Sequence, residues 1–344
     1  MKRFVRTLLI VLLTLVLSWF VVYDLGSISY FAPMEKASDY ETSDFYQTVA
    51  ASRPVRRLCD KVVLVPVDGL SRAEIAEVIS QVAFCAPAAT GVDLLFGYPQ
   101  PGTDEELREA IASLPVAVVP DTSAYIYADV PGLRQGGVEL EAESRLGTIR
   151  RYRSAGHTAG ELALASGRAP VAAGGLLEFG FYDFETVYPG EILDSETTLN
   201  GAIVLIGTLA DVSDMHPTAV GADTPGMLIH ATAIASMLAE RPVRTPPEWF
   251  DWLLAVVLCA AFVHANLRLK EREGGELLMR LLQLGMLLMI IAAGTLLYLH
   301  LRVNVNFGRP LLMVGTAALS VDVWCGAMAL RRYMRNKTRK KEKA

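Results

Sequence analysis

Four long apolar segments constrain this chain most strongly, because a helix of roughly 20 apolar residues crosses a bilayer. They are residues 7–23, 249–267, 281–299 and 311–330 of the 344-residue sequence. The first segment is short for a span and follows Lys2, Arg3 and Arg6, which favours an uncleaved signal anchor over a cleaved signal peptide. These segments exclude a soluble cytoplasmic enzyme.

The connections between the apolar segments predict how the chain is oriented. Residues 1–6, the 268–280 loop and the 331–344 tail are basic, and four spans place all three on one side. Basic connections stay in the cytoplasm. Both termini are therefore expected in the cytoplasm, with residues 24–248 and the short 300–310 loop outside. The tail holds eight Lys/Arg and one Glu, so it is expected to anchor the topology and attract anionic membrane lipid.

The region between the first two apolar segments differs in charge from the rest of the chain. Residues 24–248 hold 15 Lys/Arg and 31 Asp/Glu, whereas the remainder holds 17 and 6. An acidic surface repels phosphates, which argues against binding of nucleic acid. The local basic stretch 150–153 is expected to be solvated or paired internally rather than to bind an anion.

Asp322 is the one carboxyl group within the last apolar segment. An ionisable group at the centre of a bilayer is costly unless it is paired or hydrated. Asp322 is expected near mid-membrane, where it either pairs with Gln283 or His264 or stays protonated and fixes the register of helix packing. One carboxylate alone is a poor basis for a transport path.

The region 24–248 reads as an α/β domain, a parallel or mixed sheet with helices on both faces. Nearly continuous apolar runs predict buried strands. Capping signals between these runs predict helices. The predicted strands are residues 61–67, 88–96, 115–119 and 202–206, and the predicted helices are 39–57, 71–83, 103–113, a short one from 158, and 225–238. Alternation at this spacing implies right-handed crossovers.

Cys59 and Cys85 are the two cysteines of this region, and an extracytoplasmic compartment permits disulfides. Cys59 precedes the first predicted strand, and Cys85 ends the helix that packs back beside it. The sequence leaves open either a bridge or two buried thiols.

The chain carries a set of motifs at residues 43–46, 63–68 with Ser71, 91–96, 104–107, 201–207 and 210–231, and Trp249 stands ahead of three spans. Together these motifs resemble the CHASE2 family, an extracytoplasmic sensory domain of bacterial receptors. The resemblance implies a sensor domain in the periplasm of a bacterial inner-membrane protein. Asp68-Gly69 stands where the family commonly has paired acids, and the Trp-Pro element expected next is absent. Because 14 residues follow the last span, the resemblance implies a receptor without its own output domain, acting on a separate effector.

Ligands of open parallel sheets bind outside the carboxyl ends of the strands. This principle places two predicted loops together and makes their polar residues the ligand-binding candidates: Asp68, Gly69, Ser71, Thr208, Asp211 and Asp214. Helix capping is the alternative role for Asp68 and Ser71, and Asp93 is expected to satisfy backbone donors. Asp211, Asp214, His216 and His230 are weak candidates for a metal site, because no His-x-x-x-His or cysteine pair supports them.

The sequence shows no nucleophile elbow, phosphate loop or dinucleotide fingerprint, so no catalytic residue and no cofactor is predicted. The first hypothesis is a non-enzymatic membrane sensor. It binds an unknown periplasmic ligand or partner and signals in trans to a cytoplasmic or membrane effector, and a homodimer is expected by analogy with other receptors. The alternatives are an assembly subunit of an envelope complex and, third, a metal-dependent periplasmic hydrolase.

Overall fold

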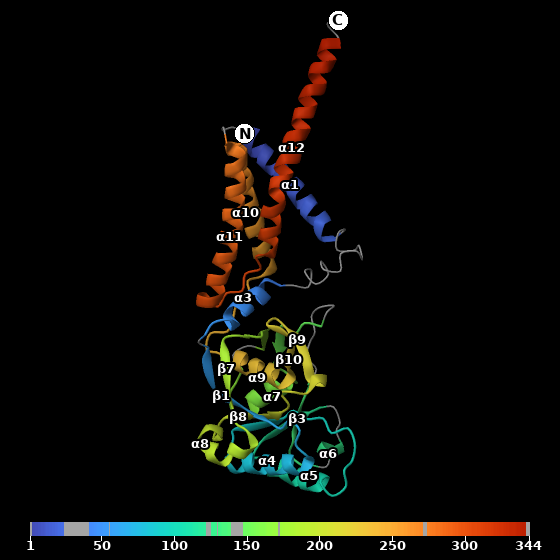
Figure 1. Cartoon of the computed structure of the whole chain (residues 1–344), viewed down its shortest axis with the longest axis vertical. Helices are drawn as coiled ribbons and strands as arrows, with labels where there is room; N and C mark the ends of the chain where they lie inside the picture. The colour runs from blue at the N-terminus through green and yellow to red at the C-terminus, as the bar shows by residue number, and fades with distance from the viewer. Residues whose placement is uncertain are drawn as a thin grey trace. The chain divides into compact units, whose positions relative to one another are not determined.

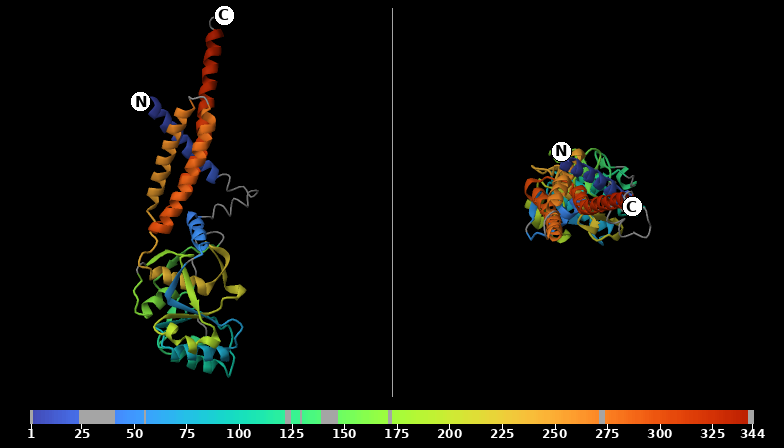
Figure 2. Two further views of the ribbon diagram at one scale, coloured as in Figure 1. Left: turned by 60° about the vertical axis from the view of Figure 1, so that its left-hand side comes forward. Right: turned by 90° about the horizontal axis from the view of Figure 1, so that it is seen from above.

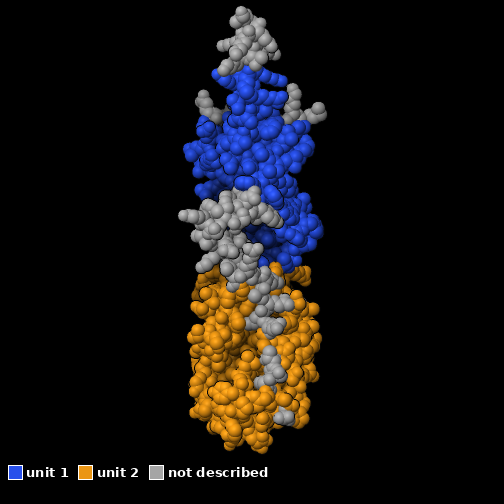
Figure 3. Space-filling model, turned by 90° about the vertical axis from the view of Figure 1, so that its right-hand side faces the viewer, with its two compact units in different colours: residues 1–46, 245–344 blue, residues 47–244 orange. Residues whose placement is uncertain are grey.

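The computed structural model describes residues 2–23, 41–54, 56–121, 125–128, 130–138, 147–170, 173–270 and 274–341. The chain divides into two compact units, residues 1–46 with 245–344 and residues 47–244 (Figure 3). The second unit lies within the predicted outward domain, and the first contains the apolar helices. Parts of four predicted regions lie outside the described residues: residue 1 of the N-terminus, 271–273 of the basic loop, 342–344 of the tail and, in the domain, 24–40, 55, 122–124, 129, 139–146 and 171–172.

The domain of residues 47–244 is built on a parallel sheet. Within the described residues it has six strands in the order β4-β3-β2-β8-β1-β7, and every neighbouring pair is parallel. The strands are β1 (Arg57–Pro66), β2 (Ala89–Val92), β3 (Ala117–Pro120), β4 (Arg134–Gly136), β7 (Tyr182–Thr186) and β8 (Ile203–Gly207). The strands β2, β3 and β8 are buried along their whole length, as continuous apolar runs predict. The predicted α/β class is confirmed.

Helices cover both faces of this sheet, as predicted (Figure 1). One core contains Val63 and Val65 of β1 with the helices α4 (Arg72–Phe84), α5 (Asp104–Ser113) and α6 (Tyr125–Ala128). The other contains Val62 and Leu64 of β1 with α7 (Thr158–Ala165) and α9 (Gly226–Met237). Successive side chains of a strand point to opposite faces, so each strand contributes to both cores.

Two antiparallel β-ribbons and several short helices complete the domain. The ribbons pair β5 (Arg151–Arg153) with β6 (Gly174–Leu176) and β9 (Met215–Thr218) with β10 (Gly221–Pro225). The short helices are η2 (Pro189–Glu191), η3 (Leu193–Ser195), α8 (Glu196–Leu199) and η4 (Val212–Asp214). Residues 151–153 of the basic stretch form β5, and Arg150 directly before it is buried. The arginines of this stretch have interaction partners within the protein. Internal pairing, one of the two expected roles, is therefore what the structure shows.

The helix α3 (Thr42–Ala51) lies in the first described stretch after α1. It ends before Pro54, as the sequence predicts, and the predicted start at residues 39–40 lies outside the described residues. The last turn of α3 is fixed in the domain, where the Thr48 hydroxyl donates to the carbonyl oxygen of Ala219 at 3.2 Å. Gly180, at φ +80°, lies against the backbone of Ala50 and Ala51, where a Cβ atom would overlap. Gly180 is therefore required by both its conformation and this close approach.

The two cysteines of the domain are free thiols, and both are buried. Cys59 packs in the core that contains α7 and α9, whereas Cys85 packs in the core that contains α4 and α5. These two cores lie on opposite faces of the sheet. The register of β1 is irregular between Cys59 and Val63, so Cys59 and Val63 belong to different cores, and Cys59 lies on the face opposite Cys85. The hypothesis of a Cys59–Cys85 bridge is wrong for this structure, and its alternative of two thiols is what the structure shows.

Three helices of the described chain are long and apolar enough to cross a membrane: Glu248–Leu269, Gly275–Leu301 and Gly308–Arg335. They correspond to α10 (Glu248–Leu269), to α11 (Gly275–Leu296) with the π-helix η5 (Leu297–Leu301), and to most of α12 (Gly308–Lys341). Figure 2 shows these helices side by side. The helix α1 (Lys2–Tyr23) has a shorter apolar part, Phe4–Phe20. Three of the four predicted spans are therefore supported, and the first remains a prediction.

Asp322 does not have the partners that the sequence predicted. Its carboxylate forms ion pairs with Lys270 at 3.2 Å and with Arg280 at 3.3 Å. The amide of Gln283 instead donates to the carbonyl oxygens of Val314 and Gly315. Long basic side chains from the ends of α10 and α11 reach Asp322 along the helices. The expected pairing of Asp322 with Gln283 or His264 is therefore wrong.

Candidate functional site at the carboxyl edge of the sheet

The strand β8 lies at a topological switch of the sheet. The neighbours of β8 are β1 and β2, which lead into α4 and α5 on one face. The chain after β8 leads into α9 on the opposite face. Loops that leave adjacent strands toward opposite faces open a crevice between them, and this crevice is where open α/β sheets bind ligands. The three loops concerned are residues 67–71, 93–103 and 208–225.

Asp68 joins the loop after β1 to the loop after β8. Its carboxylate accepts hydrogen bonds from the backbone N–H of Leu209 at 3.0 Å and of Ala210 at 2.8 Å. The predicted proximity of these two loops is therefore confirmed. Asp68 itself is exposed, and Gly69 next to it adopts φ +75° in the turn. Contact of these two residues with a ligand remains a prediction.

Ser71 has the capping role that the sequence offered as its alternative. The Ser71 hydroxyl accepts from the backbone N–H of Glu74, and the Glu74 carboxylate accepts from the backbone N–H of Ser71 at 2.7 Å. This reciprocal arrangement is a capping box, which starts α4. The hydrogen bonds from Ser71 lower the pKa of Glu74.

The two aspartates of the loop after β8 have different interaction partners. Asp211 accepts from the backbone N–H and the hydroxyl of Ser213, and these hydrogen bonds lower the pKa of Asp211. Asp214 lies 3.2 Å from Nε2 of His216. The Asp214 carboxylate also lies against Gly226, the first residue of α9, where a Cβ atom would stand 2.5 Å from Oδ1. A negative charge at a helix N-terminus is favourable. Thr208 is half-buried between β8 and this loop.

Asp93, at the carboxyl end of β2, forms a buried pair with His230 of α9. Their side chains are 14% and 7% exposed, and Oδ2 lies 4.0 Å from Nε2. Burial raises the pKa of the Asp93 carboxyl, His230 opposes this effect, and Asp214 adds to it. Burial of the Tyr127 hydroxyl, together with the nearby Asp93 carboxyl, raises the pKa of Tyr127. The sequence interpretation assigned Asp93 to backbone donors and missed this pair. The available signal was an aspartate at the end of an apolar strand.

A buried carboxyl group with a raised pKa is a marker of functional sites, because a charge in a low-dielectric position costs stability. The Asp93–His230 pair is buried, whereas Asp214 and His216 are partly exposed nearby in the fold, since Asp93 senses both electrostatically. The carboxyl edge of the sheet, where the strand order predicts a crevice, therefore combines a buried acid–histidine pair with a second pair open to solvent. We name these four residues the crevice cluster.

The weak metal candidates are not assembled into a single site. Asp211 bonds to Ser213, Asp214 to His216, and His230 faces Asp93. Among the residues that the structure describes, no group of three or more His, Cys, Asp or Glu side chains is arranged to hold a metal ion. The hydrolase hypothesis remains a prediction.

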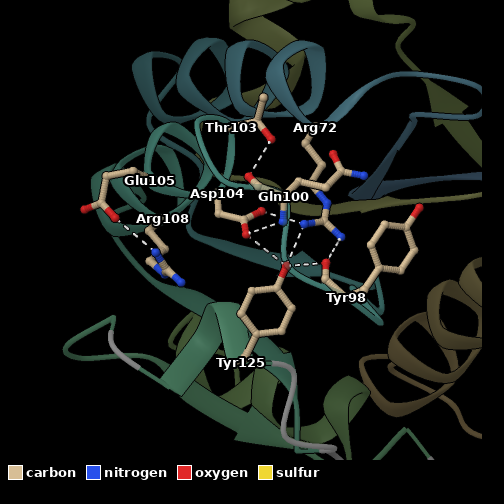
Figure 4. A network of polar contacts seen from close by, with 8 residues as sticks. All are labelled: Arg72, Tyr98, Gln100, Thr103, Asp104, Glu105, Arg108 and Tyr125. Atoms are coloured by element: carbon tan, nitrogen blue, oxygen red, sulfur yellow. Dashed lines mark hydrogen bonds and ion pairs between the residues drawn. The ribbon is translucent and has the colours of Figure 1, made fainter.

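The loop after β2 is fixed by Arg72, a buried arginine of α4 (Figure 4). Its guanidinium donates to Asp104 at 2.5 Å, to the hydroxyl of Tyr125 at 2.6 Å and to the carbonyl oxygen of Tyr98 at 2.6 Å. It also lies over the ring of Phe96 at 5.2 Å. This network joins α4, α5 and α6 to the loop that follows Asp93, so it holds that loop in place.

Comparison with protein families matches residues 55–264 to the CHASE2 domain. The chain belongs to the CHASE2 domain family. The searches of curated proteins and of solved structures find no match. The match covers the sheet and both helical layers and ends within α10. Five of the six motifs that carried the resemblance lie inside the match, and residues 43–46 lie before it.

The CHASE2 domain is an extracytoplasmic sensory domain. The crevice cluster lies entirely within the matched region, since Asp93, Asp214, His216 and His230 all fall between residues 55 and 264. The chain thus combines a CHASE2 domain with three helices long and apolar enough to cross a membrane.

Proposed function

We propose that this CHASE2 protein is a non-enzymatic membrane sensor that binds its ligand or partner at the crevice beside β8. The observation that carries the proposal is the buried Asp93–His230 pair at the topological switch, where the fold opens its loops in opposite directions. The shape of the sheet favours binding there, and the unfavourable burial of Asp93 marks the same position. Thr208 and Gly69 border this crevice in the two loops that Asp68 joins.

The proposed membrane arrangement has four spans, α1 included, with both termini in the cytoplasm and the CHASE2 domain in the periplasm. The basic residues of the N-terminus, the 268–280 loop and the tail support it. Alkaline phosphatase fused after Arg244 or Arg302 is expected to be active, and fused after Lys270 or Leu330 inactive. Green fluorescent protein at the same four positions serves as the control, with the opposite pattern. Phosphatase activity after Lys270 would contradict the arrangement.

Signalling in this proposal requires that the ligand bind two arrangements of the helices with different affinity, because equal affinity shifts no equilibrium. The helix α12 supports a contact with a separate effector, since it continues as one helix to Lys341, beyond its apolar part. Its basic end is then the surface presented to the cytoplasm.

Cross-linking in cells, followed by affinity purification, tests this function. The full chain is compared with a version truncated after Leu330, which keeps all apolar segments and removes the basic end of α12. A cytoplasmic partner recovered with the full chain and lost with the truncation is the expected result. Recovery of the same envelope proteins with both versions would instead indicate an assembly subunit.

A further inference from the structure

The turn between β6 and β7, residues 177–181, is buried along its whole length, although turns normally run over the surface. It contains Glu178, whose side chain belongs to a residue that is 1% exposed. A buried carboxyl group lowers stability unless hydrogen bonds compensate for the lost water. The partners of Glu178 therefore show what this turn does. We name residues 177–181 the junction turn.

The junction turn holds the segment through which the chain leaves the domain. This exit segment, residues 240–247, lies between α9 and α10; its residues are exposed or half-buried, and none belongs to either core. The Glu178 carboxylate accepts a hydrogen bond from the backbone N–H of Val243 at 2.8 Å. Because core packing does not fix the exit segment, this buried acceptor sets the point at which the chain leaves the domain.

The junction turn also holds the helix through which the chain enters the domain. Gly180 lies so close to the backbone of Ala50 and Ala51, at the end of α3, that a Cβ atom would overlap. The guanidinium of Arg53, which follows α3, lies 5.5 Å from the centre of the Phe181 ring. These residues and the turn belong to the same compact unit. The two chain connections of the domain therefore meet at one buried turn.

The junction turn is fixed on α9, the helix that carries His230 of the crevice cluster. The backbone N–H of Glu178 donates to the Ser236 hydroxyl at 3.0 Å, and that hydroxyl donates to the carbonyl oxygen of Thr232. Every residue of α9 except Leu228 is buried, so the helix is held on all sides. Rigid elements and hydrogen-bond networks carry coupling between distant positions. The helix α9 thus joins the crevice cluster to the junction turn.

We propose that the junction turn is a relay, through which a change at the Asp93–His230 pair reaches the exit segment by way of α9 and Glu178. The proposal rests on the proposed function, because it takes the crevice as the place where a stimulus acts. The relay has two arrangements, with the Glu178–Val243 hydrogen bond formed in one and broken in the other. A stimulus shifts this equilibrium only if it favours one arrangement over the other.

Hydrogen exchange of the full chain in detergent, read by mass spectrometry, tests the hydrogen bond. The prolines of the exit segment have no N–H, so the Val243 amide supplies a large part of the signal from residues 240–247. Glu178→Met removes the acceptor and is expected to speed this exchange about five-fold, the effect of losing one hydrogen bond. Glu178→Gln keeps an acceptor oxygen and is expected to retain most of the protection.

The matched control is Glu185→Met, which replaces an exposed glutamate of β7 and is expected to leave the exit segment unchanged. Unchanged exchange of α9 in Glu178→Met shows that the domain still folds. Equal effects of Glu178→Met and Glu185→Met on the exit segment would overturn the proposal.

A double-mutant cycle tests the relay itself. Asp93→Asn is expected to change exchange of the exit segment about three-fold in the otherwise unaltered chain and to have no further effect in Glu178→Met, because residues that act through one network are not additive. An exit segment that does not respond to Asp93→Asn, or responds equally in both backgrounds, would overturn the relay. Recovery of a cytoplasmic partner in the truncation experiment is a separate readout, so that result leaves the sensor proposal standing.

Val243→Pro repeats the test without altering the buried turn, because it removes only the donor N–H. Trypsin cleaves after Arg244 but not after Arg241, which precedes Pro242. Cleavage after Arg244 in the full chain is expected to be about five-fold faster in Val243→Pro, again the effect of one lost hydrogen bond. An unchanged rate would show that Glu178 does not hold the exit segment and would overturn the proposal even if Glu178→Met does not fold.

Discussion

Replacing Arg72 by methionine is expected to lower the free energy of unfolding of the CHASE2 domain by about 3 kcal/mol, because it leaves a buried carboxylate without its cation. Asp104 is 6% exposed and has no other cation in the described network. Arg72→Lys is expected to recover only part of the loss, since an ammonium group lacks the planar fork that reaches Asp104 and Tyr98 together.

Pulse proteolysis in urea measures this change in the full chain in detergent. Tryptophan fluorescence is unsuitable, because all four tryptophans lie outside residues 47–244. The matched control is Arg108→Met, which breaks the ion pair with Glu105 one turn away on an exposed surface. This control is expected to cost less than 1 kcal/mol. Equal losses for Arg72→Met and Arg108→Met would show that the network does not hold the loop.

The same pair predicts a response to acid. Burial raises the pKa of Asp104, but hydrogen bonds, including the one from Arg72, outweigh burial and hold the pKa below its ordinary value. The unfolded chain then binds a proton more readily than the folded chain. The stability that Asp104 contributes is therefore complete above about pH 4 and lost as the pH falls further. Arg72→Met is expected to flatten this acid limb of the profile.

Replacing Asp93 by asparagine is expected to raise the stability of the domain at neutral pH by about 1 kcal/mol. A gain of this size is typical when a functional residue that destabilises the fold is replaced. The folded-state pKa of Asp93 is raised, so the folded chain binds the proton more readily than the unfolded chain. Stability from this group is present at low pH and is lost as the pH rises from the ordinary value to the folded pKa. Asparagine keeps the shape and removes that loss.

Pulse proteolysis between pH 5 and 8 measures the sign, and the chosen control is Asp211→Asn. Asp211 is exposed, and hydrogen bonds from Ser213 lower its pKa, so its replacement is expected to reduce stability slightly. A large loss of stability in Asp93→Asn at neutral pH would contradict the prediction. It would show instead that the contact with His230 stabilises a charged Asp93.

Local patterns were sufficient to predict the centre of the fold. The second half of β1 and the whole of β8 are continuous apolar runs, and the Ser71–Glu74 capping box is a contact between residues three apart. Such signals depend on residues that are close in the sequence. The edge strands β4 and β7 were not predicted, because they are short and largely unburied, and they are strands only through pairing with β3 and β1.

One contact of the candidate site was predicted from the sequence, and another was not. The meeting of the loops after β1 and β8 followed from the rule for parallel sheets, and the bonds from Leu209 and Ala210 to Asp68 confirm it. The pairing of Asp93 with His230 was not predicted, because no local pattern links β2 to α9.

The sequence by itself therefore determined the class of the domain, the core strands, the cap of α4 and the apolar segments, all of which follow from periodicity and short-range hydrogen bonds. The predicted cap at Thr103 does not form, because the Thr103 side chain makes no capping hydrogen bond. Only the tertiary structure decided which polar groups meet. Asp93 with His230, Asp322 with Lys270, and the separation of Cys59 from Cys85 depend on strand order and on the face from which each helix packs. The physical reason is that these contacts join residues distant in the sequence, and their geometry is set by the packing of whole elements rather than by neighbouring residues.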